Sequence, residues 1–317
     1  MAEQSRVRNW VEYLGIRCGV GCVNVLPYRV ALALAWLLAW VLYYGVRMKR
    51  VRTRRRIREV FPDISEKRVR EIGFLALRNL LFNIVEMMRL ERLTFAASKR
   101  RIEGYEAMVG ALNGLRASSS APRGLIVGTG HLGNWYLGVC AVARAGVPTF
   151  LITGRMRNPL INEWLTQMNV RCGINVYERG KVAMRGILER LRAGEVLGIM
   201  TDTRMPKPEL SVSFLGKVAN LGRGMASFAR AENVPIVPTV FMRIGWTRFR
   251  LDTAAPVVPD MAAEKMADIE RMTRDVVSSV ERAILSAPEQ WFGWYNGRWV
   301  FDPLRPSVAT ENVEGRI

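Results

Sequence analysis

The sequence predicts an α/β protein with a mixed central sheet flanked by helices, preceded by a membrane-associated helix near the N-terminus. Half of the 317 residues are apolar, which is enough for a substantial core. An uncharged run fills residues 30–46, and short apolar segments alternate with helical ones from residue 124 onward. Such alternation is typical of a sheet covered by helices.

The uncharged run, VALALAWLLAWVLYYGV, is bounded by Arg29 and Arg47. As a helix it spans roughly 26 Å, close to a thin bilayer core, and its Trp and Tyr residues lie near the far end. The basic stretch RMKRVRTRRRIR follows directly, so the positive-inside rule places the C-terminal side in the cytoplasm. We expect residues 1–60 to anchor the protein to a membrane, either by spanning it or by lying on it.

Residues 61–92 are predicted to form a long helix. A Phe-Pro turn precedes it, Ser65 offers an N-cap, and apolar residues recur at spacings of three and four. The stretch NGLRASSSAPRG, residues 113–124, is predicted to be a polar linker. We expect residues 61–317 to form one α/β domain behind the anchoring region.

The remaining elements are predicted from apolar runs and the turn residues that flank them. Strands are expected at 124–129, 148–153, 174–177, 196–200, 211–216 and 235–244. Helices are expected from about 133, from 159, at 181–193, at about 222–233 and at 262–286.

The formal net charge of +19, with a pI near 10.7, narrows the range of partners. Phosphates, anionic lipid headgroups and acidic proteins would all be attracted. Basic residues interleave with the membrane segment and no known nucleic-acid-binding module occurs, so no nucleic-acid partner is expected. Four cysteines and one histidine form no clustered ligand set, so no metal site is predicted. The cysteines are expected to be small buried hydrophobes in a reducing compartment.

The chain's single histidine, His131, lies in the stretch GTGHLGNWYLG, just past the first confident strand. In open α/β sheets, catalytic groups gather at the carboxyl ends of strands. Gly130 and Gly133 permit a tight turn and the close approach of a ligand. A structural histidine that caps a helix is the alternative. Because any imidazole chemistry must use this residue, we predict that His131 is a general base at the mouth of a cleft.

The block GHLGNWYLG resembles the H-x4-D/E block of the lysophospholipid acyltransferase superfamily. It is most similar to that of the lipid A late acyltransferases (lauroyl or myristoyl acyltransferases), where it often reads His-Phe/Leu-Gly-Asn-Trp-Glu. Further similar blocks follow in consistent order over residues 10–303. They are RRRIREVFPDISEKRVREI, ITGRMRNPLINEWLTQMNVRCGINVY, TDTRMPKPELSVSFLGKVANLGRGMASFARAENVPIVPTVF and APEQWFGWYNGRW. The resemblance implies a fold like that of glycerol-3-phosphate acyltransferase.

The resemblance also implies an O-acyltransferase at the cytoplasmic face of a bacterial inner membrane. It would move a fatty acyl group from acyl carrier protein or coenzyme A to a hydroxyl of a lipid A precursor or related glycolipid. His131 would deprotonate that hydroxyl, and a paired carboxylate would orient the imidazole and stabilise its positive charge. Acyl carrier protein and a phosphorylated glycolipid would be the partners, and the transfer would need no metal or other cofactor.

Tyr136 occupies the position where the family has its acid. A neutral phenol supplies no negative charge, and replacing the buried Asp of a serine protease triad by Asn costs about 10⁴ in rate. Another carboxylate could serve instead, with Asp202 and Glu163 as candidates. Alternatively, Tyr136 suffices for an easier transfer, or the protein binds lipid without catalysis. His131, Tyr136 and Asp202 are therefore the candidate catalytic residues.

Six residues are candidates for substrate binding. The resemblance implies that basic groups hold phosphates and the tetrahedral oxyanion, and a glycine-rich loop with cations before a helix suits an anionic headgroup. They are Asn134, Arg155, Asn158, Gly216, Lys217 and Arg223. The first three follow predicted strands and are expected near His131. The last three belong to FLGKVANLGRG, expected to be a glycine-rich loop before a helix. The stretch WFGWYNGRW near the C-terminus is expected to be core packing or interfacial aromatics.

Overall fold

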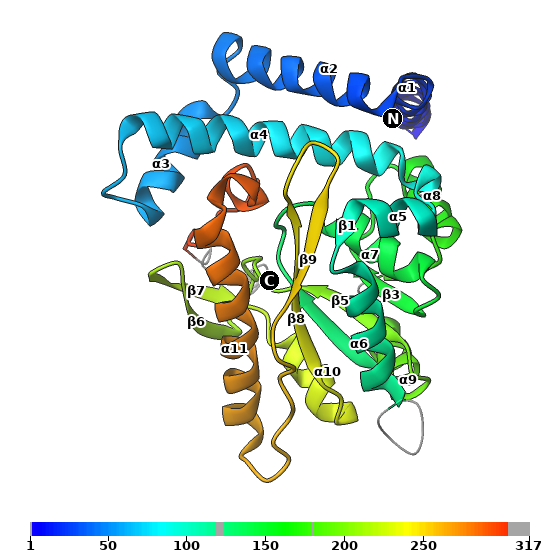
Figure 1. Cartoon of the computed structure of the whole chain (residues 1–317), viewed down its shortest axis with the longest axis vertical. Helices are drawn as coiled ribbons and strands as arrows, with labels where there is room; N and C mark the ends of the chain where they lie inside the picture. The colour runs from blue at the N-terminus through cyan, green and yellow to red at the C-terminus, as the bar shows by residue number, and fades with distance from the viewer. Residues whose placement is uncertain (1, 118–122, 179–180, 304–317) are drawn as a thin grey trace, which may run out of the picture.

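A seven-stranded sheet forms the centre of the computed structural model, which describes residues 2–117, 123–178 and 181–303 (Figure 1). The strand order is β1-β9-β8-β2-β5-β3-β4. The strands are β1 (Ile102–Glu103), β2 (Leu125–Thr129), β3 (Thr149–Thr153), β4 (Ile174–Glu178), β5 (Val196–Met200), β8 (Ile236–Arg243) and β9 (Phe249–Thr253). The five strands from β8 to β4 are parallel, and β9 is antiparallel to β8. The predicted mixed α/β sheet is confirmed.

Helices cover both faces of the sheet, because successive residues of its buried strands point to opposite sides. On β2, Leu125 packs into one core cluster and Ile126 into the other. The first cluster includes residues of α5 (Phe95–Arg101), α6 (Tyr105–Ala117), α7 (Trp135–Arg144) and α8 (Pro159–Arg171). The second includes residues of α9 (Lys181–Arg192), α10 (Gly224–Glu232) and α11 (Lys265–Ser286).

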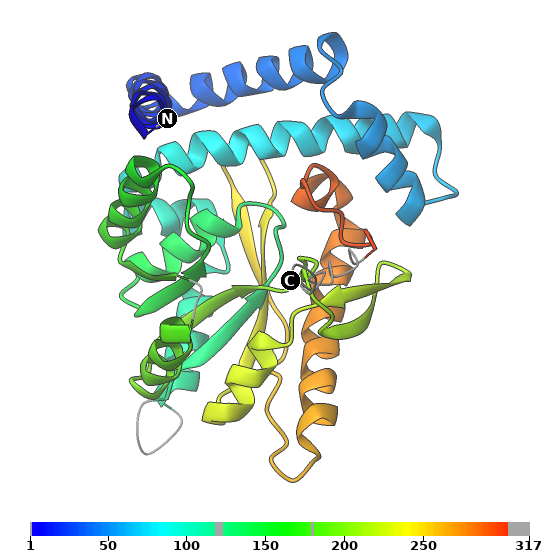
Figure 2. The ribbon, with the colours of Figure 1, turned by 180° about the vertical axis from the view of Figure 1, so that it is seen from behind.

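The N-terminal helices form a layer over one end of the sheet. They are α1 (Ala2–Val25), α2 (Tyr28–Trp40) with a π-helical turn at Val41–Gly45, α3 (Arg50–Val60) and α4 (Glu66–Met88). In both views α2 lies along the outer side of α4 (Figures 1 and 2). The predicted cap is confirmed, since the Ser65 hydroxyl accepts the Arg68 N–H at 3.2 Å. Within the described residues, Tyr28–Gly45 is the one helical segment long and apolar enough to cross a membrane.

Two predicted loops are wrong. The predicted linker at 113–124 begins inside α6, which continues to Ala117, and residues 118–122 lie outside the described residues. The glycine-rich stretch is a hairpin of β6 (Leu210–Phe214) and β7 (Lys217–Leu221). Its turn uses the positive φ of Gly216, +76°, whereas Ala219 and Leu221 are buried on alternate positions of the strand.

The cysteines divide into two classes. Cys140 and Cys172 are buried, as expected of small apolar residues, whereas Cys18 and Cys22 are exposed on α1, where the prediction was wrong. The reason is that α1 lies at the edge of the molecule, so most of its side chains reach the surface.

Candidate active site

The sheet order brings His131 and Asp202 together. Strands β2 and β5 are parallel neighbours, with Thr129 opposite Met200, and each of the two residues follows its strand by two positions. His131 Nδ1 lies 2.8 Å from Asp202 Oδ1, and the His131 backbone N–H donates to Asp202 Oδ2 at 2.8 Å. The carboxylate therefore holds both the ring and the backbone of the histidine.

The turn that carries His131 is held by neighbouring backbone. Gly133 has a φ of +59°, and a Cβ there would lie 1.8 Å from the Phe241 carbonyl oxygen. At Gly130 a Cβ would lie 2.5 Å from Val280. The close approach that these glycines permit is thus to the protein's own β8 and α11. The Gly133 N–H also donates to the carbonyl of Gln290 at 3.0 Å.

Asp202 is buried and receives a third hydrogen bond from the Trp291 indole. The side chain is 1 % exposed, and Trp291 Nε1 donates to Oδ2 at 2.8 Å. Trp291 comes from the stretch that was expected to be core packing or interfacial aromatics. It does pack in the core, at 1 % exposed, but its donor also orients the carboxylate. One indication of this role is present in the sequence: Trp291 carries an indole N–H, and a buried Trp N–H usually donates to a hydrogen-bond acceptor.

The pair is electrostatically coupled. Burial by itself lowers the pKa of His131, but the charge and hydrogen bond of Asp202 outweigh it, so the pKa lies above the usual histidine value. Burial by itself raises the pKa of Asp202. The charge of His131 and the hydrogen bonds from His131 and Trp291 outweigh that effect, so this pKa lies below the usual carboxyl value. The site therefore favours an ionised carboxylate beside a basic imidazole.

One nitrogen of His131 remains available. The side chain is 25 % exposed, and no described residue forms a hydrogen bond with Nε2. Trp135 lies edge-on to the imidazole with ring centroids 4.9 Å apart, and Phe292 lies 6.0 Å away. With the Nδ1 proton donated to Asp202, the Nε2 lone pair can accept a proton from a bound hydroxyl.

Tyr136 faces away from this pair. Consecutive helical residues point about 100° apart, so Trp135 reaches His131 while Tyr136 packs toward α8. Its hydroxyl donates to Asn169 Oδ1, and burial raises the pKa of the phenol, which stays neutral. Among the described residues, Asp202 is the carboxylate that contacts His131, and Glu163 is exposed on α8 with its carboxylate accepting from Gln167.

Asn134 belongs to a second charged cluster beside the turn. Its Oδ1 caps α7 by accepting the Leu137 N–H at 3.1 Å, and its Nδ2 donates to Glu86 of α4. Glu86 also accepts two hydrogen bonds from Arg243, at the end of β8, and one from Tyr28 of α2. With 2 % of its surface exposed, Asn134 positions the start of α7 through contacts within the protein.

Arg155 and Asn158 follow β3, which β5 separates from β2. Asn158 caps α8 with Oδ1, and its Nδ2 donates to the Asn9 carbonyl at 2.9 Å and to Glu12 at 3.0 Å. It therefore connects α8 to α1, and it makes no contact with His131. The Arg155 side chain is exposed and forms no hydrogen bond or ion pair with another described residue.

The three residues of the predicted headgroup loop do not form one loop: Gly216 and Lys217 are neighbours at the hairpin turn, whereas Arg223 follows the other end of β7. Gly216 forms the hairpin turn, and Lys217 pairs with Glu59 of α3 at 2.7 Å. Arg223 is exposed just before α10, and its backbone N–H donates to Glu209 at 3.0 Å. The structure does not place these residues in one loop around an anion.

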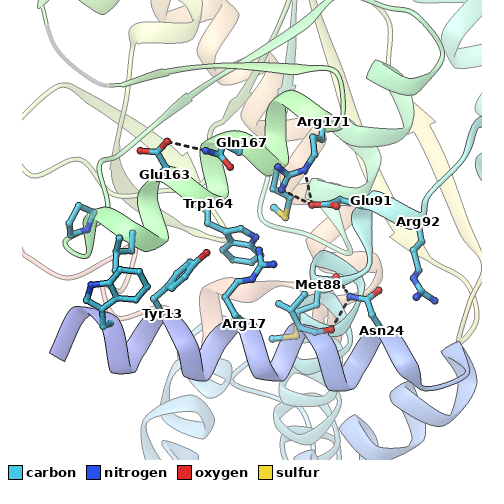
Figure 3. A pocket seen from close by; sticks show the side chains of 15 residues that line it. Tyr13, Arg17, Asn24, Met88, Glu91, Arg92, Glu163, Trp164, Gln167 and Arg171 are labelled. Carbon is cyan, nitrogen blue, oxygen red and sulfur yellow. Dashed lines mark hydrogen bonds and ion pairs between the residues drawn. The ribbon is translucent and has the colours of Figure 1, made fainter. Parts of the chain in front are cut away.

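A cavity of about 790 Å³ lies between α1, the end of α4 and α8, and His131 is not among its lining residues (Figure 3). Within the described part of the chain, no group of three or more His, Cys, Asp or Glu could hold a metal ion.

Among known protein families, one family model matches the chain over nearly its whole length. The model of the family described as bacterial lipid A biosynthesis acyltransferase matches residues 2–300. This range includes the N-terminal helices, the His131 turn, Asp202 and Trp291. A search of curated proteins found no match.

Proposed function

The chain belongs to the family of bacterial lipid A biosynthesis acyltransferases, and on this premise we propose that it is an O-acyltransferase that acylates a phosphorylated glycolipid. The acceptor is a hydroxyl of a lipid A precursor or a related glycolipid. The donor is a fatty-acyl thioester of acyl carrier protein, with acyl coenzyme A as the alternative. The net charge of +19 suits an acidic carrier protein and a phosphorylated acceptor.

The observation that carries this proposal is the His131–Asp202 pair with its unoccupied Nε2. Nε2 takes the proton of the acceptor hydroxyl as its oxygen attacks the thioester carbonyl. Asp202 stabilises the imidazolium that forms, and the buried indole of Trp291 keeps the carboxylate ionised and oriented. As the tetrahedral intermediate collapses, the C–S bond breaks and the proton passes from Nε2 to the leaving sulfur. An ester and a free thiol are the products.

This mechanism uses Asp202 where the family block has an acid at position 136. The ionised partner is supplied from the neighbouring strand end, so Tyr136 needs no catalytic role and serves to pack α7 on α8. The reaction as written balances without a metal or another cofactor. We propose that none takes part.

We propose that the N-terminal region, residues 1–60, anchors the domain that follows by lying on the membrane. On its inner side, α2 packs Ala31, Ala35 and Ala39 along α4, and on its outer side it exposes large apolar residues. They include Val30, Leu34, Leu37, Leu38 and Trp40, and Val41 of the π-helical turn that follows is also exposed. Glu86 of α4 contacts Arg243 of β8, so α4 lies between α2 and the sheet. The outer side of α2 therefore faces away from the sheet, where it can contact the bilayer surface. The cytoplasmic face of the inner membrane is the proposed location.

The test is acyl transfer in vitro with the full chain in neutral detergent micelles. Labelled acyl carrier protein or acyl coenzyme A is the donor, and a phosphorylated glycolipid is the acceptor. We expect His131→Ala to lower the rate by about 10²- to 10⁴-fold, as for loss of a general base. An equal rate in a His131→Ala protein of unchanged melting temperature would refute the mechanism. Mass spectrometry of lipids from cells with and without the protein identifies the acceptor.

A further inference from the structure

The 790 Å³ cavity has the size of a ligand pocket but lies outside the catalytic machinery. Its walls come from α1, the end of α4 with the turn that follows, and α8 (Figure 3). No residue of the His131 turn, the Asp202 loop or the Trp291 segment lines it. The cavity is therefore a separate site in the layer that carries the proposed membrane surface.

Its cations outnumber its acids, and two of them are unpaired. Arg171 is held by Glu91 at 2.8 Å. Arg17 and Arg92 form no ion pair with any described residue, although Arg17 lies over the Trp164 ring with 5.9 Å to its centroid. In Figure 3, Arg17 and its neighbours point from α1 into the space below α8. Arg92 lies at the other end of the cavity, beyond Met88 and Asn24 (Figure 3). The guanidinium group of Arg17, which no carboxylate of the described residues neutralises, suits a phosphate group.

The rest of the lining combines the polar residues Asn24, Glu163 and Gln167 with an apolar and aromatic wall. That wall includes Trp10, Tyr13, Val20, Met88, Leu160, Trp164 and Met168. Trp10 lies edge-on to Tyr13 at 5.9 Å and is 46 % exposed, so this wall continues onto the outer surface of α1. That surface also exposes Val7, Val11 and Leu14. Aromatic residues with flanking cations are the composition found where a protein meets the headgroup level of a bilayer.

We propose that this cavity binds one anionic phospholipid from the membrane, with its phosphate at Arg17 and the first part of an acyl chain against Trp10, Tyr13 and Trp164. Arg92 adds positive charge at the other end of the cavity. A free phosphate would engage the cations but leave the aromatic wall unused. The lipid fills the space between α1 and α8, beside the connection that Asn158 makes to α1. This site rests on the proposed membrane attachment, and it does not depend on acyl transfer.

Binding is measured on the full chain in nanodiscs of phosphatidylcholine with 20 % phosphatidylglycerol, followed by native mass spectrometry in neutral detergent. We expect about one phosphatidylglycerol to be retained per chain. The double variant Arg17→Met/Arg92→Met is expected to lower its affinity at least about tenfold, as for loss of a charge-assisted hydrogen bond. The matched control Arg6→Met/Arg100→Met removes the same charge from exposed residues outside the lining and is expected to change affinity less than twofold.

Two further arms distinguish the sources of the phosphate. Trp164→Ala should weaken phosphatidylglycerol binding but leave binding of inorganic phosphate unchanged. If inorganic phosphate binds the wild type as tightly as phosphatidylglycerol, the ligand is a free phosphate and the lipid assignment is overturned. Equal losses in both double variants, or no loss in Arg17→Met/Arg92→Met, would also overturn it. If that variant does not fold, Arg17→Met alone makes the same comparison, with an expected loss of several-fold.

Failure of the proposed lipid site and failure of the proposed acyl transfer can be told apart. Lipid retention needs no acyl donor, so a protein that retains phosphatidylglycerol without acyl transfer would refute the enzyme and keep the site. A protein that transfers acyl groups normally but retains no phosphatidylglycerol would keep the enzyme and refute the site.

Discussion

His131–Asp202 and Arg243–Glu86 are both buried charged pairs at the carboxyl edge of the central sheet. Both members of the second pair are almost fully buried, at 4 % and 1 % exposed, and both oxygens of Glu86 are occupied. In the first pair Asp202 is equally buried, but His131 is 25 % exposed and keeps Nε2 unbonded. Burial of charge by itself therefore does not identify a catalytic site. A satisfied pair holds elements together, whereas a pair with one unused and accessible atom can react.

The sharpest test of this difference removes the charge of Asp202. Asp202→Asn keeps the shape of the side chain but cannot stabilise an imidazolium, so we expect the acyl-transfer rate to fall by about 10⁴-fold. Asp252→Asn, in the exposed pair with Arg250, is the control and should change the rate less than twofold. A small loss in Asp202→Asn would show that the pair is structural like its neighbour.

The second substitution removes the negative charge of the Arg243–Glu86 pair and is expected to change stability. Glu86→Gln leaves Arg243 buried without a countercharge and weakens the contacts to Tyr28 and Asn134. We expect a loss of about 3–5 kcal/mol in the free energy of unfolding, measured by urea denaturation in detergent. Glu289→Gln, which touches the more exposed Arg68, should cost less than about 1 kcal/mol. Comparable losses in the two variants would remove the contrast.

The protonation of His131 can be followed directly, because the chain has one histidine. In untagged protein labelled at histidine, its NMR titration should give a pKa above the usual value of about 6.5, since Asp202 favours the charged ring. The neutral base is then lost as the pH falls through this raised pKa, and the rate should drop about tenfold per pH unit below it. In Asp202→Asn, burial remains without the countercharge, so the pKa should fall below 6.5. A pKa that does not move would contradict the coupling.

Trp291 tests whether the carboxylate must be oriented. Trp291→Phe removes the hydrogen bond to Asp202 Oδ2, and we expect the rate to fall by about tenfold or more. Trp294→Phe is matched, because Trp294 is buried in the same aromatic cluster and donates to the Pro288 carbonyl. It should lower the melting temperature similarly with less than threefold effect on the rate. Equal rate losses would assign both residues to packing.

The smallest effect is expected at Tyr136. Tyr136→Phe removes one hydrogen bond to Asn169, so we expect a loss of about 1 kcal/mol in stability and less than threefold in rate. Tyr136→Glu would bury a carboxylate against α8, distant from any contact with His131, and should lower stability without raising the rate. A faster Tyr136→Glu enzyme would show instead that the wild type lacks its acid.

Local elements were predictable because short stretches of sequence encode them. The strand before His131, the cap at Ser65, the helix start at Pro159 and the glycine turn each depend on neighbours within a few residues. The hairpin at Gly216 was missed because glycines and lysines are shared by loops and exposed strands. The expected placement of Arg155 near His131 depended on the order of the strands, and β5 lies between the two.

An α/β sheet, an apolar helix with a basic flank and one imidazole at the end of a strand could all be predicted from the sequence. The sequence also contains the ordered blocks that resemble an acyltransferase family. The partner of that imidazole, in contrast, follows from the fold. Asp202 and Trp291 are distant from His131 in sequence, and they meet it because parallel strands end at one edge and the C-terminal segment returns there. Tyr136, five positions away, is turned aside by the period of its helix.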